Sequence, residues 1–124
     1  VLFLGNKSRE ELQEIYANCK FSVVPSEYLE AYGNVILESF AFGKTVITSD
    51  LVGIKEEIEQ NNVGLTYSFK NQEALEEKMV ELLSNSGLKS ELENNIPNYL
   101  VTKTFAKHFS DLVNVYENLL SRNR

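Results

Sequence analysis

Residues 23–58 read VVPSEYLEAYGNVILESFAFGKTVITSDLVGIKEEI, and this stretch decides the fold. An apolar run ends at Pro25, and a polar loop follows it. Gly33 then opens a helical pattern, which we expect to stop at Gly43 because glycine readily adopts the left-handed conformation just past a helix end. A second apolar run, Thr45–Ser49, comes next. The order strand, loop, helix and strand predicts a βαβ unit.

The same alternation extends in both directions along the chain. Short apolar runs that are nearly continuous are typical of parallel strands covered on both faces. Such runs occur at Val1–Gly5, Phe21–Pro25, Thr45–Ser49 and Val63–Tyr67. We therefore predict an α/β fold, with a Rossmann-like parallel sheet of about four strands flanked by helices. Because a complete mononucleotide-binding sheet usually has about six strands, we expect one edge of this sheet to be open.

The expected helices carry recognisable start and stop signals. Ser8 and Glu11 form a capping box at the start of the first helix. Asn85-Ser86-Gly87 separates two later helices, and the second of these is expected to end before Pro97. Apolar residues at helical spacing predict helices around Ile54–Gln60, through Leu75, Met79, Leu82 and Leu83, through Leu88, Leu92 and Ile96, and through Phe105, Phe109, Leu112, Tyr116 and Leu119.

Length and composition exclude several classes of protein. The 124 residues suffice for one core, so residues 1–124 are predicted to be a single domain. The net charge of −6 argues against a partner with a phosphate backbone, so no nucleic acid is expected. A single cysteine, Cys19, and the lack of an apolar stretch of roughly 20 residues predict a cytoplasmic protein. Because the chain begins at Val1 without Met, we expect a piece of a longer protein.

The loop before Gly33 is the predicted ligand site. Ligands in open α/β sheets bind beyond the carboxyl ends of the strands, where this loop lies. The N–H groups around Ala31–Val35 have no partner within the helix, and together with the helix dipole they favour a phosphate or diphosphate. Glu30 and Glu38 would instead accept hydrogen bonds from neutral hydroxyl groups such as those of a sugar. The pattern therefore predicts a site for a sugar diphosphate.

This ordered series resembles the E-x7-E signature region of the retaining GT-B glycosyltransferases, family 4 in particular. Glu30, seven intervening residues and Glu38 match the motif itself. Further matches surround it at Pro25-Ser26, Gly33, Ala41-Phe42-Gly43-Lys44, Val46-Ile47 and Gly53-Ile54-Lys55-Glu56. The likeness extends more weakly to both ends of the chain. It implies that the chain is the truncated, nucleotide-sugar-binding part of a GT-B C-terminal domain.

The resemblance also implies a role for each motif residue. Glu30 would be the catalytic residue, contacting hydroxyls of the transferred sugar. Backbone amides at the helix start would hold the sugar and the diphosphate, and Glu38 would bind the ribose hydroxyls. The full set of donor-binding residues is Ala31, Tyr32, Gly33, Asn34, Val35 and Glu38. The leaving diphosphate would help to deprotonate the acceptor on the same face of the sugar, so that the anomeric configuration is retained without a protein base.

The same resemblance implies the partners of the chain. The donor would be a nucleotide-diphosphate sugar, with no cofactor and no metal. Asp50 and Asp111 are the only aspartates, so a D-x-D metal motif is impossible, and one His with one Cys leaves no zinc site. The acceptor, a glycan or lipid-linked sugar in polysaccharide biosynthesis, would bind a missing N-terminal domain that can place the protein at the inner membrane face. The family's diphosphate-binding Arg and Lys lie upstream as well, so the fragment alone is expected to be inactive.

The chain departs from the family pattern in the segments around the motif. Tyr32 stands where Phe is usual, Val52 replaces the first glycine of a Gly-Gly pair, and Lys55 replaces a common Pro. The last two changes put the loop after the third predicted strand in doubt as a donor contact.

Alternative functions remain at this point. One is a noncatalytic α/β interaction module such as a receiver-like domain. Receivers need an acidic pair just after the first strand, where this chain has Gly5-Asn6-Lys7. Another is a docking role for the helix at residues 104–120, whose apolar side could also promote self-association. UDP-, GDP- and ADP-sugars would satisfy the predicted donor contacts equally.

Overall fold

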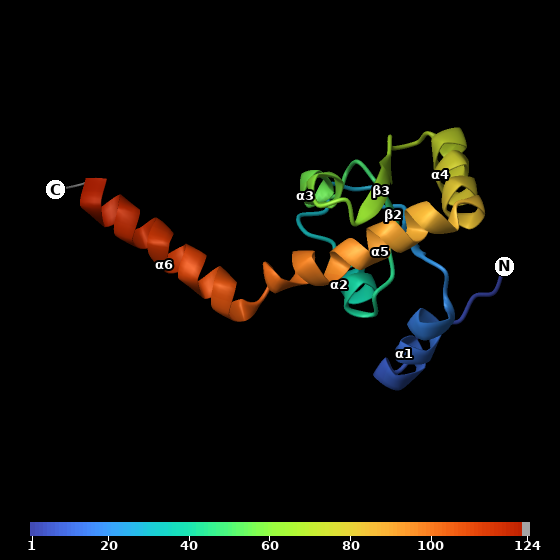
Figure 1. Ribbon diagram of the computed structural model, residues 1–124, viewed down its shortest axis with the longest axis horizontal. Coiled ribbons are helices and arrows are strands. Elements are labelled where there is room, and N and C mark those ends of the chain that lie inside the picture. Colours follow the sequence, from blue (N-terminus) through green and yellow to red (C-terminus); the bar gives the residue numbers. More distant parts are fainter. Residues whose placement is uncertain (123–124) are drawn as a thin grey trace.

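A computed structural model describes residues 1–122, and these form a parallel sheet flanked by helices (Figure 1). The strands β1 (Ser22–Val24), β2 (Val46–Ser49) and β3 (Gly64–Tyr67) pair in the order β1-β2-β3, with both pairings parallel. The helices are α1 (Arg9–Asn18), α2 (Asn34–Ala41), α3 (Lys55–Gln60), α4 (Gln72–Ser84), α5 (Ser86–Val101) and α6 (Phe105–Arg122). This order of elements confirms the predicted α/β class.

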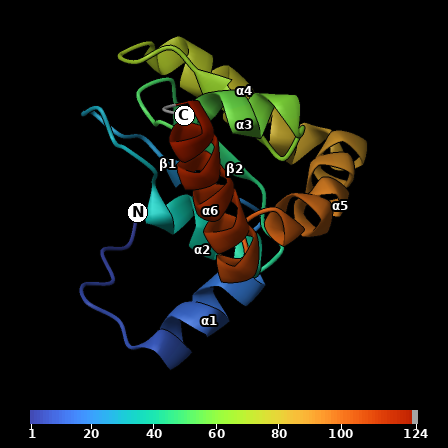
Figure 2. The same cartoon turned by 90° about the vertical axis from the view of Figure 1, so that its left-hand side faces the viewer.

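The sheet has a core on each face, because successive side chains of a strand point to opposite sides. Val46 packs on the side of α2 and α3, whereas Ile47 packs on the side of α4, and Figures 1 and 2 show α2 and α4 on opposite sides of the sheet. The first cluster comprises Ile36, Phe40, Val46, Val52, Ile54, Ile58, Val63, Ile96 and Tyr99. The second comprises Ile47, Leu82 and Leu92. Helix α5 contributes to both clusters and so joins the two layers.

Hydroxyl groups on β2 and at its start are buried but bonded, as buried polar groups require. Each donates to a main-chain carbonyl of another segment. The bonds run from Thr45 Oγ1 to Val63 O (2.8 Å), from Thr48 Oγ1 to Val24 O (3.0 Å) and from Ser49 Oγ to Ser26 O (2.7 Å). Side-chain hydrogen bonds therefore hold β2 to its neighbouring segments in addition to the main-chain hydrogen bonds of the sheet.

The expected strand at Val1–Gly5 is wrong, and the sheet has three strands rather than about four. A strand forms when its N–H and C=O groups pair with a neighbouring strand. The segment lies apart from the sheet in Figure 1, and its side chains from Val1 to Leu4 are exposed. Without a partner strand or a covering layer, the apolar run has neither hydrogen bonds nor burial to hold it in the sheet.

The predicted helix end before Pro97 is also wrong, since α5 continues to Val101. Proline removes one helical hydrogen bond and crowds the preceding turn. Here Ile96 and Tyr99, on either side of Pro97, are 1% and 2% exposed within the core of the α2 face. Their burial holds the helix across the proline, so packing outweighs local propensity.

Other predicted boundaries are confirmed. The capping box at the start of α1 is present, with both the Ser8 and the Glu11 side chains bonded. Helix α2 lies between Gly33 and Gly43, and both glycines have positive φ.

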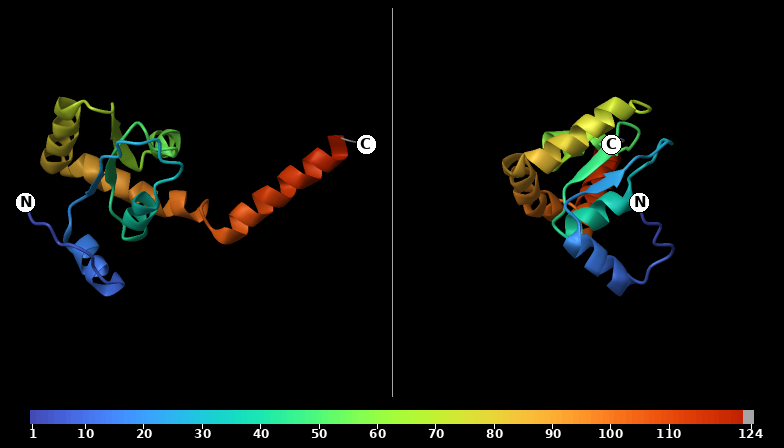
Figure 3. Two further views of the ribbon diagram at one scale, coloured as in Figure 1. Left: turned by 180° about the vertical axis from the view of Figure 1, so that it is seen from behind. Right: turned by 90° about the vertical axis from the view of Figure 1, so that its right-hand side faces the viewer.

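The closing helix predicted from Phe105 to Leu119 is present as α6, and it extends away from the rest of the molecule (Figures 1 and 3). Residues 105–121 are all exposed. The uncovered apolar side includes Phe105, Phe109, Leu112, Val113, Tyr116, Leu119 and Leu120. Within residues 1–122, no helix has the length and apolar character needed to cross a membrane.

Candidate functional site

The loop between β1 and α2 is held by the segment that follows β2. Glu30 and Val52 form an isolated parallel bridge. The Glu30 N–H donates to Leu51 O at 3.1 Å, and the Gly53 N–H donates to Glu30 O at 2.7 Å. The main chain of the predicted donor loop is therefore fixed beside the segment that follows β2. This is the segment in which Val52 and Lys55 depart from the family pattern.

Gly53 permits this close approach because it has no side chain. A Cβ atom at Gly53 would lie 2.2 Å from Ala31 O and 3.2 Å from Glu30 O. Real Cβ atoms do not come so near to main-chain oxygen, so glycine is required by packing here. Gly53 belongs to a segment of the family pattern, but its place in the sequence does not reveal which loop it contacts.

Gly33 gives α2 an open start. It is the N-cap residue with φ 77°, and no side chain caps the helix. The Ile36 N–H donates to Gly33 O at 2.9 Å, and within residues 1–122 no hydrogen-bond partner is found for the N–H groups of Gly33, Asn34 and Val35. These groups, together with the helix dipole, form the kind of environment that binds phosphate oxygens.

The Glu30 side chain lies beside this helix start. Its Oε2 accepts a hydrogen bond of 2.7 Å from Ser26 Oγ. Its Cδ would lie 3.9 Å from a Cβ atom placed on Gly33, so the carboxylate lies directly against that glycine. Ser26, a residue of the family pattern, is thus the orienting partner of Glu30, a contact that the sequence reasoning did not predict.

Glu38 lies further along α2, facing α1. It lines a hollow of about 270 Å³ together with Arg9, Leu12, Tyr16, Ala41 and Phe42. The rings of Tyr16 and Phe42 stack with centroids 5.0 Å apart. Burial, and then the charge of Glu38, raises the pKa of the Tyr16 hydroxyl. Helix α1, which forms the second wall of this hollow, lies outside the family motif and could not be assigned to it from the sequence.

The structure therefore places the predicted site residues in the loop before α2 and along the first two turns of that helix. Glu30 and the residues Ala31–Val35 meet at the start of α2, and Glu38 lies four residues beyond its first residue, Asn34. Four helical residues span about 6 Å along the axis. The Glu30 carboxylate thus lies at the helix start, and the Glu38 carboxylate belongs to the second turn of the same helix.

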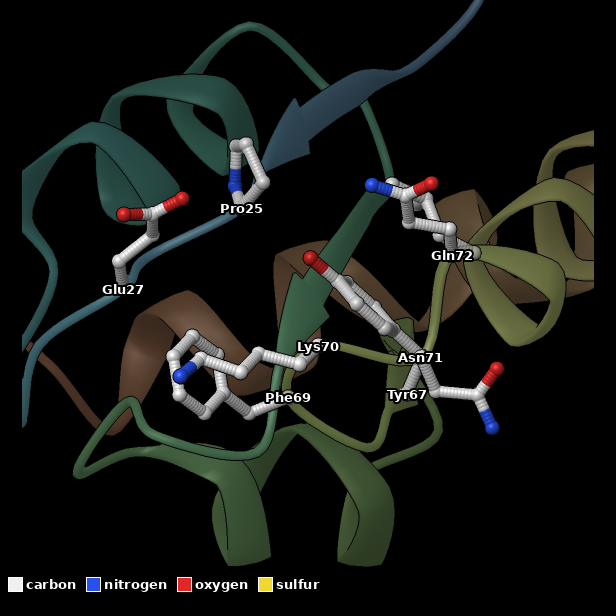
Figure 4. Close-up of a pocket in the computed structure, with 8 residues that line it drawn as sticks. Pro25, Glu27, Tyr67, Phe69, Lys70, Asn71 and Gln72 are labelled. Carbon is white, nitrogen blue, oxygen red and sulfur yellow. The ribbon is translucent and has the colours of Figure 1, made fainter.

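A second hollow lies on the α4 side of the sheet, at the carboxyl ends of β1 and β3 (Figure 4). Its volume is about 240 Å³, and it is lined by Pro25, Glu27, Tyr67, Phe69, Lys70, Asn71, Gln72 and Leu75. Figure 4 shows Pro25 and Glu27 across from the residues that follow β3. None of the predicted donor-binding residues lines this hollow.

A cluster that the sequence reasoning missed lies beside Tyr32. Glu57 Oε2 accepts a hydrogen bond of 2.8 Å from the Tyr99 hydroxyl and pairs with the Lys103 ammonium. The Lys103 Nζ lies 5.2 Å from the centroid of the Tyr99 ring and 5.9 Å from that of Tyr32. Burial, and then the bond to Glu57, raises the pKa of Tyr99. One ammonium group is thus surrounded by a carboxylate and two aromatic rings.

The cluster predicts a pH dependence of stability. Burial alone would raise the pKa of Glu57, but the hydrogen bonds from Lys103 and Tyr99 outweigh it, so the pKa lies below its usual 4.5. Such a carboxylate stabilises the fold above the unfolded pKa, and this contribution is lost as the pH falls through the folded pKa. For a partly exposed pair we expect about 1 kcal/mol or less. Urea unfolding should show Glu57→Gln less stable than the wild type at pH 7.

The same comparison at lower pH tests the cause. The difference between Glu57→Gln and the wild type should shrink as the pH falls below about 4.5, the usual pKa of the carboxyl group, and disappear below the lower pKa of the folded state. A difference that stays constant from pH 7 to pH 3 would show that the Glu57 charge does not stabilise the fold.

Comparison with known proteins identifies relatives of this chain. A family model described as "Glycosyl transferases group 1" matches residues 1–99. An uncharacterized glycosyltransferase of Methanocaldococcus jannaschii is 36% identical over 107 residues, which is 86% of this chain and 28% of that protein. The N,N'-diacetylbacillosaminyl-diphospho-undecaprenol alpha-1,3-N-acetylgalactosaminyltransferase of Campylobacter jejuni is 36% identical over 95 residues, which is 77% of this chain and 24% of that protein.

Solved structures of GT-B glycosyltransferases share the fold. WaaG, a glycosyltransferase involved in lipopolysaccharide biosynthesis, has a TM-score of 0.67 at 28% identity, over 77% of this chain and 26% of its own. Sucrose-phosphate synthase from Thermosynechococcus elongatus has a TM-score of 0.78 at 24% identity, over 98% of this chain and 31% of its own. The chain thus spans about a quarter to a third of the length of these four proteins.

Proposed function

This chain belongs to the glycosyl transferases group 1 family, and from that membership we propose that it is the donor-binding part of a retaining glycosyltransferase. It would bind a nucleotide-diphosphate sugar and present it to a glycan or lipid-linked acceptor. The observation that supports this most directly is the start of α2, where within residues 1–122 the N–H groups of Gly33, Asn34 and Val35 have no partner and the Glu30 carboxylate lies against Gly33. Because the chain belongs to this family, we no longer consider the alternative of a receiver-like domain.

The spacing of these groups suits the parts of a sugar nucleotide. The transferred sugar would lie at Glu30, and the diphosphate at the N–H groups of Ala31–Val35. The nucleoside would follow α2 for about 6 Å, with its ribose at Glu38. The stacked rings of Tyr16 and Phe42 line the hollow there, next to Glu38, and offer apolar surface to the base.

Charge explains why carboxylates and an anion can share this site. A phosphate would repel a carboxylate, but it is favoured by the dipole and N–H groups at the helix start. A carboxylate accepts hydrogen bonds only, and the hydroxyls of a sugar or a ribose donate them. Glu30 and Glu38 therefore select for hydroxyl groups at the two ends of a diphosphate.

The proposed reaction needs no base from this chain. The bond between the anomeric carbon and the diphosphate oxygen breaks, and a bond to the acceptor oxygen forms on the same face. The acceptor proton passes to the leaving diphosphate, so the configuration is retained. Glu30 would hold the sugar hydroxyls during this exchange, and no metal or further cofactor is proposed. Since the acceptor would bind outside these residues, we propose that the isolated chain binds the donor without transferring it.

A titration monitored by amide chemical shifts tests the proposal. UDP, GDP and ADP and their glucose or mannose conjugates are added to the 124-residue chain, with a chelator present throughout. We expect shifts centred on Ala31–Glu38, and the base that binds most tightly names the nucleotide. In Glu38→Ala the affinity for the matching nucleotide should fall about tenfold to a hundredfold, because a hydrogen bond to a charged group contributes about 1.5–3 kcal/mol.

Glu76→Ala is the matched control, since it removes the same charge from an exposed position of α4. Its affinity should equal that of the wild type. The proposal is contradicted if no nucleotide causes localised shifts at millimolar concentration, or if the shifts centre on the hollow around Tyr67 and Phe69 instead.

A further inference from the structure

The connection between α5 and α6 lies against the proposed donor loop. Lys103, in this connection, is partly buried, and its ammonium faces the ring of Tyr32. Tyr32 immediately precedes Gly33, the N-cap of α2. A residue of the α5–α6 connection thus lies beside the loop that we propose to bind the donor.

The Lys103 ammonium is held in this place by two other elements. Glu57 on α3 pairs with it, and Tyr99 on α5 contributes both its hydroxyl, through Glu57, and the face of its ring. Tyr99 is itself fixed by the core, where its ring meets that of Phe40 edge-on with centroids 5.6 Å apart. The ammonium is therefore attached to buried structure rather than to a mobile surface side chain.

Tyr32 has less support of its own. The residue is 38% exposed. A cation within about 6 Å of an aromatic centroid attracts the ring, and the attraction grows as the pair is desolvated. The ring of Tyr32 is thus oriented from one side by Lys103, while the main chain at Glu30 is fixed from the other by Gly53. The two contacts thus act on residues 30 and 32 of the same loop.

We propose that Lys103 is a positioning residue for donor binding: held by Glu57 and Tyr99, it orients Tyr32 and so keeps the N–H groups at the start of α2 aimed at the diphosphate. This inference rests on the proposed donor site. It adds a residue outside the motif, which touches neither the sugar nor the nucleotide and acts through the shape of the loop.

Lys103→Met tests the inference in the whole 124-residue chain. Methionine keeps an unbranched chain of similar length but removes the charge. Before any ligand is added, the amide resonances of residues 30–33 and the ring resonances of Tyr32 should shift. The affinity for the nucleotide diphosphate that the wild type binds should then fall about fivefold, and Lys103→Arg should restore it to within twofold because arginine also pairs with carboxylates and aromatic faces.

Two further variants separate positioning from a general loss of stability. Lys107→Met removes the same charge four residues later, where Lys107 pairs with Asp111 on α6, and it should leave Tyr32 and the affinity unchanged. Tyr32→Leu should also weaken binding about fivefold. Because Lys103 is proposed to act through Tyr32, the double variant should bind the nucleotide diphosphate no more weakly than either single variant. If the two side chains acted independently, their fold-losses of affinity would multiply.

The outcomes distinguish this inference from the proposed function. If the wild type binds no nucleotide, the donor site itself is overturned, and the positioning role falls with it. If the wild type binds and Lys103→Met binds equally well, the donor site stands and the role of Lys103 is overturned. The same holds if the losses of affinity in Lys103→Met and Tyr32→Leu multiply in the double variant. A lower free energy of unfolding in Lys103→Met with unchanged resonances of Tyr32 would likewise show a purely structural role.

Discussion

Gly53→Ala is expected to lower the free energy of unfolding by about 3 kcal/mol or more, as overpacking against a rigid neighbour does. The added Cβ would lie 2.2 Å from Ala31 O, and that oxygen belongs to main chain rather than to a flexible side chain. Relief requires the segment after β2 to move away from the donor loop. The bridge between Glu30 and Val52, and the bond from Gly53 N–H to Glu30 O, would then be lost. Urea unfolding measures the change.

Gly87→Ala provides the control for the loss of a glycine. Gly87 lies in the first turn of α5, and the nearest atom to an added Cβ is Asn85 Oδ1 at an ordinary 3.4 Å. Since alanine is a better helix former than glycine, this variant should be as stable as the wild type, or more stable by up to about 1 kcal/mol. Similar losses in both variants would show that the Ala31 contact is not the cause.

Glu30→Gln is expected to separate binding of the sugar from binding of the nucleotide. The amide keeps the shape of the side chain and can still accept from Ser26, but it lacks the charge that strengthens bonds to sugar hydroxyls. The affinity for the nucleotide sugar should fall about tenfold to a hundredfold. The affinity for the nucleoside diphosphate alone should stay within twofold of the wild-type value, because this ligand has no transferred sugar for Glu30 to contact. Calorimetric titration of both ligands gives the two dissociation constants.

Glu38→Gln is the natural partner of this experiment, since it makes the same change at the ribose end of the proposed site. It should weaken the nucleoside diphosphate and the nucleotide sugar by the same factor. If both substitutions weaken both ligands equally, the assignment of one carboxylate to each end of the donor is wrong. If Glu30→Gln changes neither affinity, Glu30 does not contact the sugar before transfer.

Local signals predicted much of this structure, because they depend on few residues. Gly33 and Gly43 fix both ends of α2 through positive φ, and Ser8 with Glu11 starts α1 through its capping box. The apolar run at Thr45–Ser49 predicted a strand covered on both faces, and all of these side chains are buried. The order of strands and helices then followed from the preference for parallel βαβ units.

The failures came where distant parts of the chain decide the outcome. Val1–Gly5 has the composition of a strand, but a strand also needs a neighbour, and no local pattern tells whether one is present. Pro97 is a local signal for a helix end that burial of the surrounding side chains overrides. In both cases tertiary context, rather than the residues themselves, determines the conformation.

In the proposed site, too, local signals predicted some residues and contacts between distant segments determine others. The motif identified Glu30, Gly33 and Glu38 as residues of the proposed site because they are close in sequence. Arg9 beside Glu38 and Lys103 beside Tyr32 come from elements far away in the chain, and their spacing carries no helical or strand period. The packing of α1 and of the α5–α6 connection brings these cations to the proposed site.

The buried hydroxyls on β2 and at its start have a consequence for how the sheet opens. The bonds from Thr45, Thr48 and Ser49 reach carbonyls on both sides of the central strand, beyond the ladder itself. A slip of one residue would turn Thr48 toward the opposite face and break this set together. The strands therefore hold their register as one cooperative unit, and β1 cannot fray from β2 without exposing buried hydroxyl groups. We therefore expect the loop that β1 carries at its carboxyl end to be anchored to a slowly opening part of the molecule.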